Sequence, residues 1–115
     1  MLDVMHTKEG DVATLGLNGR LDSITAPAFE QALAKLLKEG NCRVVMACEN
    51  LVFISSAGLR VLLAFAKQLK KQSGQMALCG VQPTVHAVLE SSGFLGFLKL
   101  CASMDEAAAH VNPPK

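Results

Sequence analysis

The sequence contains no tryptophan and no tyrosine, and its 11 lysine and arginine residues almost balance its 10 acidic residues. The five phenylalanines carry no polar group for recognising a base, and a formal net charge of +1 gives no electrostatic case for binding phosphates. These absences argue against direct contact with nucleic acid. Half of the 115 residues are hydrophobic, which is enough to build the core of one ordered domain.

Long apolar segments are also missing. The longest apolar run of an expected helix, residues 61–66, lies between Arg60 and Lys67 and is far too short to cross a bilayer. The first ten residues are polar and charged, unlike a basic segment followed by an apolar one. We therefore expect a cytoplasmic protein without membrane insertion, in which residues 1–115 form a single domain and residues 112–115 a disordered tail.

Motifs of enzymes and of metal sites are absent as well. No Cys-x-x-Cys pair occurs, so buried reduced thiols are expected in place of zinc ligands or disulfides. The three histidines have no nucleophile or carboxylate at a recognisable spacing, and there is no phosphate-binding glycine loop and no Gly-x-Ser-x-Gly elbow. The sequence thus predicts no enzyme, no metal ligand and no cofactor. The cysteines are Cys42, Cys48, Cys79 and Cys101.

Strand patterns alternate with helix patterns along the chain. Expected strands lie near residues 2–6, 12–17, 43–48, 76–80 and 97–101, and expected helices near residues 27–39, 56–72 and 83–93, with a last helix from about residue 103. Such alternation predicts an α/β fold with a mainly parallel sheet of four to five strands and about four helices. Ser103 and Glu106 have the spacing of a capping box for the last helix.

Residues 51–63 are the most informative segment. Two hydroxyls, Ser55 and Ser56, stand directly before a leucine-rich helical pattern, and a continuous apolar run at residues 44–48 predicts a buried strand upstream. A serine in this place lies at a helix N-terminus, where free N–H groups and the helix dipole favour a phosphate. Ser56 is therefore a candidate modification site, although many serines in such places act only as N-caps.

The string Phe-Ile-Ser-Ser-Ala-Gly-Leu-Arg-Val-Leu-Leu, residues 53–63, resembles the signature of the STAS domain family, the anti-sigma factor antagonists. Further segments are similar to the family in the same order along the chain. They are residues 19–22 with the Thr-Ala-Pro of residues 25–27, residues 78–83, residues 88–94 and residues 103–107. The resemblance covers nearly the full chain and implies a STAS-like single domain.

The resemblance also implies a function, that of a phosphorylation-controlled partner-switching protein. Without phosphate, it would bind an anti-sigma factor that is also a serine kinase of the histidine-kinase-like ATPase class. Phosphorylation of Ser56 would release it, and a PP2C-type phosphatase would reset it. Ser55, which replaces an aspartate found in many members, is the alternative acceptor. The implied partner-binding residues are Asp22, Ser23, Thr25, Glu49, Ser55, Ser56, Ala57, Gly58 and Arg60.

Two alternatives remain open at this stage. The protein could be a constitutive STAS scaffold or accessory subunit, of the stressosome or transport-system type, in which the serines only cap a helix. A small-nucleotide-binding module is the weaker alternative and rests only on helix N-terminal amides. Gly58 also has two interpretations, because a missing side chain admits either a partner or a tight contact inside the fold.

The helix after Gly58 has a predictable buried side. Apolar residues at helical spacing are expected to face the sheet, and the basic residues between them to face solvent. The first set comprises Leu59, Leu62, Leu63, Ala66 and Leu69, and the second comprises Arg60, Lys67, Lys70 and Lys71.

Overall fold

The computed structural model describes residues 1–93, 96 and 98–112. Strands and helices follow one another in the order that the sequence predicts. They are β1 Leu2–Glu9, β2 Val12–Leu21, α1 Ala26–Lys38, β3 Arg43–Ile54, α2 Ser56–Lys71, β4 Gln75–Cys79, α3 Pro83–Ser91, β5 Lys99–Cys101 and α4 Met104–Val111. The sheet has the order β1-β2-β3-β4-β5, and only the β1–β2 pair is antiparallel. The predicted α/β fold with a mainly parallel sheet is confirmed.

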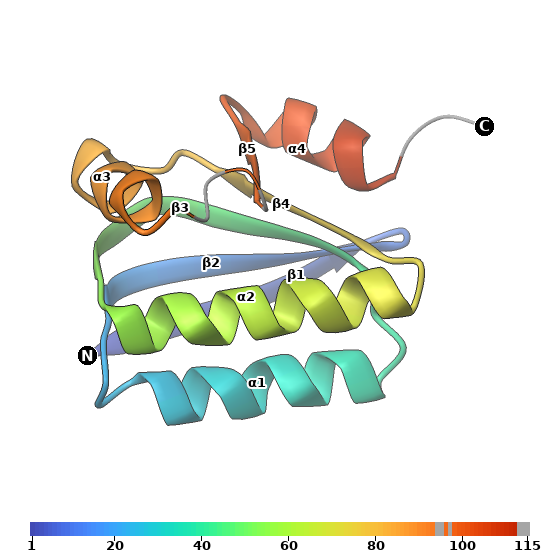
Figure 1. The fold of residues 1–115 in the computed structure, drawn as a ribbon. Coiled ribbons are helices and arrows are strands. Elements are labelled where there is room, and N and C mark those ends of the chain that lie inside the picture. The colour runs from blue at the N-terminus through green and yellow to red at the C-terminus, as the bar shows by residue number, and fades with distance from the viewer. Residues whose placement is uncertain (94–95, 97, 113–115) are drawn as a thin grey trace.

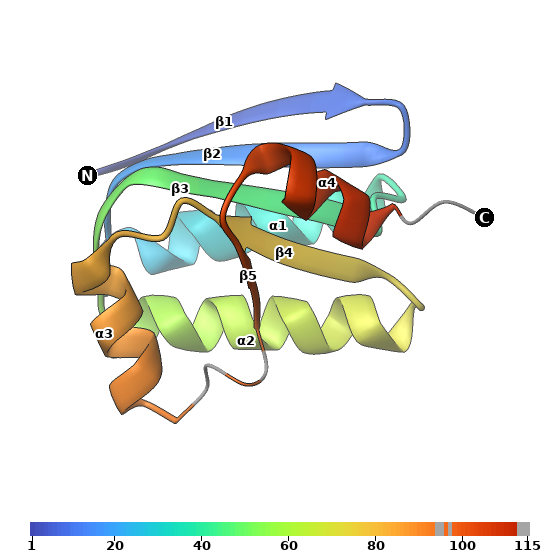
Figure 2. The same ribbon diagram turned by 90° about the horizontal axis from the view of Figure 1, so that it is seen from above.

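The helices are distributed unevenly over the sheet. α1 and α2 lie side by side on one face, and α4 covers β3, β4 and β5 on the other (Figure 1). α3 lies at the end of the sheet where α1 and α2 begin, and α4 does not extend over the edge strand β1 (Figure 2). The structure thus leaves the connections at one end of β2 and β3 open to solvent.

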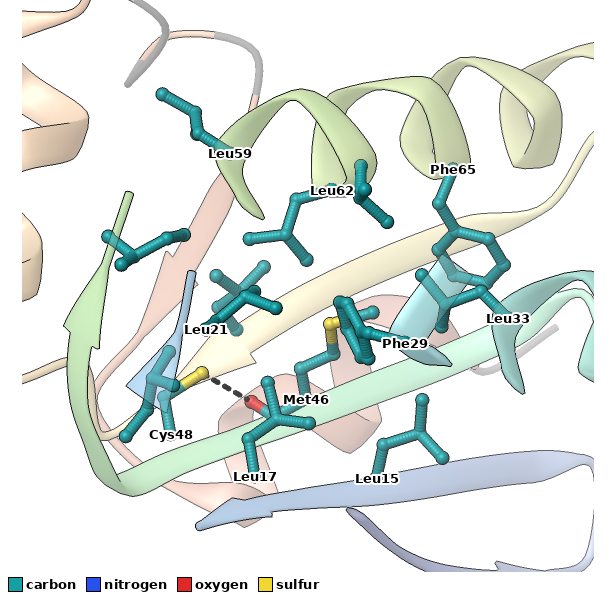
Figure 3. Close-up of a cluster of buried hydrophobic side chains, with 14 of the residues drawn as sticks. Leu15, Leu17, Leu21, Phe29, Leu33, Met46, Cys48, Leu59, Leu62 and Phe65 are labelled. Atoms are coloured by element: carbon teal, nitrogen blue, oxygen red, sulfur yellow. Dashed lines mark hydrogen bonds between the residues drawn. The ribbon is translucent and has the colours of Figure 1, made fainter. Parts of the chain in front are cut away.

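Alternating residues of β3 pack on opposite faces of the sheet, against α1 and α2 or against α4. Val44, Met46 and Cys48 belong to the large core under α1 and α2, whereas Val45 belongs to a smaller cluster with Ala107 of α4. Figure 3 shows side chains of β2 and β3 meeting those of α1 and α2 in the large core. Both faces of β3 are covered, and this explains its unbroken apolar run.

The buried stripe of α2 is shifted relative to the expectation. Leu59, Leu62 and Leu69 are buried as predicted, but Leu63 and Ala66 are only half-buried. Val61 and Phe65, which were not predicted, are buried instead. The reason is that α2 packs against α1 as well as the sheet, and Val61 and Phe65 face the α1 side together with Leu33. The basic residues Arg60, Lys67, Lys70 and Lys71 are exposed as expected.

Three strands are longer than their apolar patterns. β1 continues to Glu9, and β2 continues through Leu21. β3 continues to Ile54, beyond the expected strand at residues 43–48. The cause is pairing between the last residues of β2 and of β3, which runs from Asn18↔Asn50 to Leu21↔Ile54 with register shifts. β3 therefore leads directly into α2.

The remaining boundaries differ only slightly from expectation. α3 ends at Ser91, and β5 is restricted to Lys99–Cys101. Phe97, the expected first residue of β5, and residues 113–115 of the expected tail lie outside the described residues. In the described part of the chain, no helix is long and apolar enough to cross a membrane.

Candidate partner-binding and phosphoacceptor site

The two serines of the motif occupy different positions at the start of α2. Ser55 is the N-cap, with extended backbone angles, and its Oγ accepts a hydrogen bond of 3.3 Å from the Gly58 N–H. The Ser55 N–H donates to the Leu21 carbonyl at 2.9 Å. Ser56 is the first helical residue and is exposed, and its hydroxyl makes no hydrogen bond to any described residue. The cap and the candidate acceptor are thus separate residues.

A dense set of hydrogen bonds shapes the β2–α1 connection. One carboxylate oxygen of Asp22 accepts from the N–H of Ile24 at 3.0 Å, from the N–H of Thr25 at 3.1 Å and from the Thr25 hydroxyl at 3.2 Å. The single hydrogen of the Thr25 hydroxyl is shared with the Arg20 carbonyl, whose oxygen is 2.9 Å away. These bonds, chiefly that from the Thr25 backbone, lower the pKa of Asp22 below 3.8. Asp22 and Thr25 therefore hold the connection in shape while Ser23 is exposed.

Gly58 joins this connection to the start of α2. A Cβ atom on Gly58 would lie 2.5 Å from Leu21 Cγ and 2.9 Å from the Leu21 carbonyl oxygen. Gly58 is buried, and its missing side chain is filled by Leu21. Of the two interpretations of Gly58, this geometry supports the close contact inside the fold.

Glu49 contacts a different connection from the one that Ser55 contacts. Its carbonyl oxygen accepts a hydrogen bond from Gln82 at the start of α3, and its side chain covers Gly80. One of its carboxylate oxygens is 3.8 Å from Cys79 Sγ. The structure thus brings Glu49 to the β4–α3 connection, whereas Ser55 is bonded to the end of β2.

The other predicted site residues are Ala57 and Arg60. Ala57 is half-buried, so little of it is available to a partner. Arg60 is exposed and follows Ser56 by four residues, a spacing that places both on one side of α2. The first turn of α2 contains no acidic residue. The charges around Ser56 on this helix are therefore favourable to an added phosphate.

Three large apolar residues at this end of the sheet are exposed, and they lie within residues 22–25 and 49–56 of the expected binding surface. Ile24 is 85% exposed, Val52 49% and Phe53 36%. The Arg20 guanidinium lies over the Phe53 ring at 4.2 Å from its centroid, and Arg20 also faces Asp22, with 3.9 Å between Nε and Oδ2. A usable signal was present, since Ile24 is the only large apolar residue between polar neighbours at residues 22–25.

The cysteines do not form part of this site. Cys48, Cys79 and Cys101 are buried as expected, and Cys42 is half-buried. Burial raises the pKa of Cys48 to about 12 and that of Cys79 to about 11. The Glu49 carboxylate raises both pKa values further, and the neighbouring Cys79 adds to the shift of Cys48. The thiols of these two residues therefore remain protonated near neutral pH and are poor nucleophiles. Within the described residues, no three histidine, cysteine or acidic side chains could hold a metal ion.

Comparison with known proteins identifies the class of this protein. The sequence model of the STAS domain matches residues 3–107, and the chain belongs to the STAS domain family. Among its relatives, BtrV of Bordetella bronchiseptica, named as an anti-sigma factor antagonist, is 43% identical over 93 residues, covering 81% of this chain and 80% of BtrV. The anti-sigma F factor antagonist of Paenibacillus polymyxa is 31% identical over 90 residues, covering 77% of each chain.

Solved structures agree with the fold. A Thermotoga maritima protein described as an anti-sigma factor antagonist superposes with a TM-score of 0.88 at 22% identity, covering 94% of this chain and 93% of that one. A Mycobacterium paratuberculosis anti-sigma factor antagonist superposes with a TM-score of 0.87 at 23% identity, covering 96% and 94%. At these identities the likeness supports the architecture.

Proposed function

We propose that this protein is an anti-sigma factor antagonist whose binding is switched off by phosphorylation of Ser56. The observation that carries the proposal is that the two serines at the start of α2 have different roles. Ser55 caps the helix, whereas the Ser56 hydroxyl is exposed and makes no hydrogen bond to any described residue. The names of two relatives at 43% and 31% identity support the antagonist role. The surface around Ser56 is then the binding surface.

The partner in this proposal is an anti-sigma factor that is also a serine kinase of the histidine-kinase-like ATPase class. A phosphoryl acceptor needs no general base of its own, because the kinase supplies the metal, the base and the positioning. An exposed hydroxyl on a rigid helix start is suited to that role, and Ser56 meets both conditions. A PP2C-type phosphatase would remove the phosphate and restore binding.

Electrostatics explain how one phosphate could control the contact. The group adds about −1.5 to −2 charges at neutral pH, and the N-terminus of α2 tolerates them because its N–H groups and dipole favour an anion. In a closed interface, the same charge must be desolvated or repelled at a cost of roughly 2–5 kcal/mol. Such a cost weakens binding about 30-fold to several thousand-fold.

The test uses the purified histidine-kinase-like ATPases of the source organism as a panel. Each is mixed with this protein, first without nucleotide and then with ATP and magnesium, and binding is followed by calorimetry and phosphate incorporation by intact mass. We expect one ATPase to bind the unmodified protein, to add one phosphoryl group and then to dissociate. Binding that persists without any phosphate incorporation would instead identify a constitutive scaffold, and the switch would be rejected.

A further inference from the structure

The exposed apolar side chains of this molecule are not scattered at random. Of the six large hydrophobic residues that are exposed in the described part of the chain, three are methionines, Met1, Met5 and Met104. The other three, Ile24, Val52 and Phe53, all lie at the end of β2 and β3 that leads into α1 and α2. Isolated exposed apolar residues need no explanation, but a group at one end of the sheet indicates a contact surface.

Ile24 is the most exposed of the three, and its position is fixed. Its own N–H is bonded to Asp22, and the N–H of Thr25, the next residue, is bonded to the same carboxylate oxygen. The connection therefore presents an 85% exposed isoleucine on an ordered backbone. A side chain that is already held in place loses little backbone entropy on binding, which is the property of a good interface anchor.

The chemistry of the surroundings limits what such an anchor can bind. Arg20 and Asp22 face each other at 3.9 Å, and Arg20 also covers Phe53, so the two charges beside Ile24 largely offset each other. The complementary surface is therefore an apolar pocket with a polar rim, and not a strongly charged one. The hydrogen bond between Ser55 and Leu21 ties this connection to the start of α2.

We propose that Ile24 is the apolar anchor of the binding surface and inserts into an apolar pocket of the anti-sigma factor, with Phe53 and its covering Arg20 at the rim. The proposal rests on the proposed function, since a partner close enough to be displaced by a phosphate on Ser56 also covers the connection bonded to Ser55. In this proposal the Ile24 side chain contributes affinity for the anti-sigma factor, and phosphorylation of Ser56 lowers that affinity.

The test compares Ile24→Ala and Ile24→Leu with the wild-type protein against the ATPase that binds in the panel described above. We expect Ile24→Ala to weaken binding about 10- to 30-fold, a typical loss for an interface anchor. Because the lost contact is apolar, the factor should be the same at about 0.05 M and about 0.5 M salt. Ile24→Leu should retain most of the affinity, and Met5→Ala, which removes an exposed apolar side chain from edge strand β1, should bind like wild type.

The possible failures are distinguishable. Wild-type affinity in Ile24→Ala, with the wild-type protein bound normally, would overturn the anchor and leave the antagonist role intact. A weakening that vanishes at high salt would show an electrostatic contact and would also overturn it. If no ATPase of the panel binds the wild-type protein, the proposed function fails and the anchor with it. The thermal unfolding midpoint of Ile24→Ala should equal that of wild type, since the side chain contributes little to the core.

Discussion

Ser55 and Ser56 differ by one position in sequence and by their roles at the helix start. We expect Ser56→Ala to abolish phosphorylation by the partner kinase, because the exposed hydroxyl is lost. Ser55→Ala should leave Ser56 available but should lower the free energy of unfolding by about 0.5–2 kcal/mol, since the cap to the Gly58 N–H is removed. Tandem mass spectrometry and thermal unfolding of both variants decide the point, and a phosphate found on Ser55 would reverse the assignment.

Gly58 gives a second prediction about a single residue. In an ordinary helix, glycine to alanine is stabilising, but here the added Cβ would meet Leu21 Cγ at 2.5 Å. Overpacking of this kind costs about 1–3 kcal/mol, so Gly58→Ala should unfold at a lower temperature than wild type. Gly16→Ala is the matched control, because its nearest contact would be an ordinary 3.8 Å to Met5 Cβ. A stabilised Gly58→Ala protein would refute the internal contact.

Asp22 makes the β2–α1 connection sensitive to acid. Its pKa is lowered in the folded protein by the hydrogen bond from the Thr25 N–H, so the carboxylate stabilises the connection at pH values above about 3.8. That contribution is lost as the pH falls through the lowered pKa of the folded state. A titration of the Thr25 amide by NMR should therefore have a midpoint below the ordinary pKa of an aspartate, and Asp22→Asn should abolish it. A midpoint that is not lowered would mean that the bonds do not hold in solution.

One basic side chain of β3 forms hydrogen bonds to the end of the last helix. Arg43 Nη1 donates to the Val111 carbonyl at 3.2 Å and to Asn112 Oδ1 at 2.9 Å, at the C-terminal end of α4. Only Ala107 and Val111 of this short helix are buried, so its docking has few other contributions. Arg43→Ala should lower the free energy of unfolding by about 1 kcal/mol and loosen α4.

Loosening of α4 has its own measurable consequence. Cys79 and Cys101 lie in the small cluster beneath this helix, where they are buried. Modification by a thiol reagent should therefore be several-fold faster in Arg43→Ala than in wild type, while Lys67→Ala, an exposed charge on α2, should leave the rate unchanged. Equal rates in all three proteins would show that Arg43 does not hold α4 in place.

Local signals allowed most elements to be predicted, and long-range contacts explain the differences. The start of α4 follows from Ser103 and Glu106, and the Ser103 Oγ does accept from the Glu106 N–H at 3.2 Å. The end of β3 could not be predicted, because Glu49 and Asn50 are polar and exposed, and the strand continues beyond them through pairing of Asn50 and later residues with β2. The buried side of α2 was shifted because its neighbour α1 lies far away in sequence.

The candidate site shows the same difference between features set by local sequence and features set by long-range contacts. The place of Ser56 at the start of α2 was predictable because the motif and the helical pattern that follows it are contiguous. The internal role of Gly58 depends on Leu21, and the position of Glu49 depends on Gly80 and Gln82, so neither follows from local sequence. The polar neighbours of Ile24 point to a turn, but the hydrogen bonds that shape this turn follow only from the structure.

The architecture as a whole indicates that the proposed switch acts at the surface and leaves the fold intact. The sheet is covered by α1 and α2 on one face, and the N-terminus of α2 opens to solvent at the edge of that layer (Figure 1). A phosphate on Ser56 adds charge where the helix favours it and disturbs none of the buried contacts. We therefore expect phosphorylated protein to have a thermal unfolding midpoint equal to or above that of the unmodified protein.

Hydrogen exchange measured on the two forms completes this prediction. Protection in β2, β3 and α1 should be unchanged by phosphorylation, and any added protection should be confined to the first turn of α2, while affinity for the partner kinase falls by at least about 30-fold. Ser56→Asp is the weaker mimic, because one carboxylate carries less charge than the phosphate. Loss of protection across the sheet would show that the phosphate acts by unfolding the domain, and the control of binding would then have to be assigned to a conformational change.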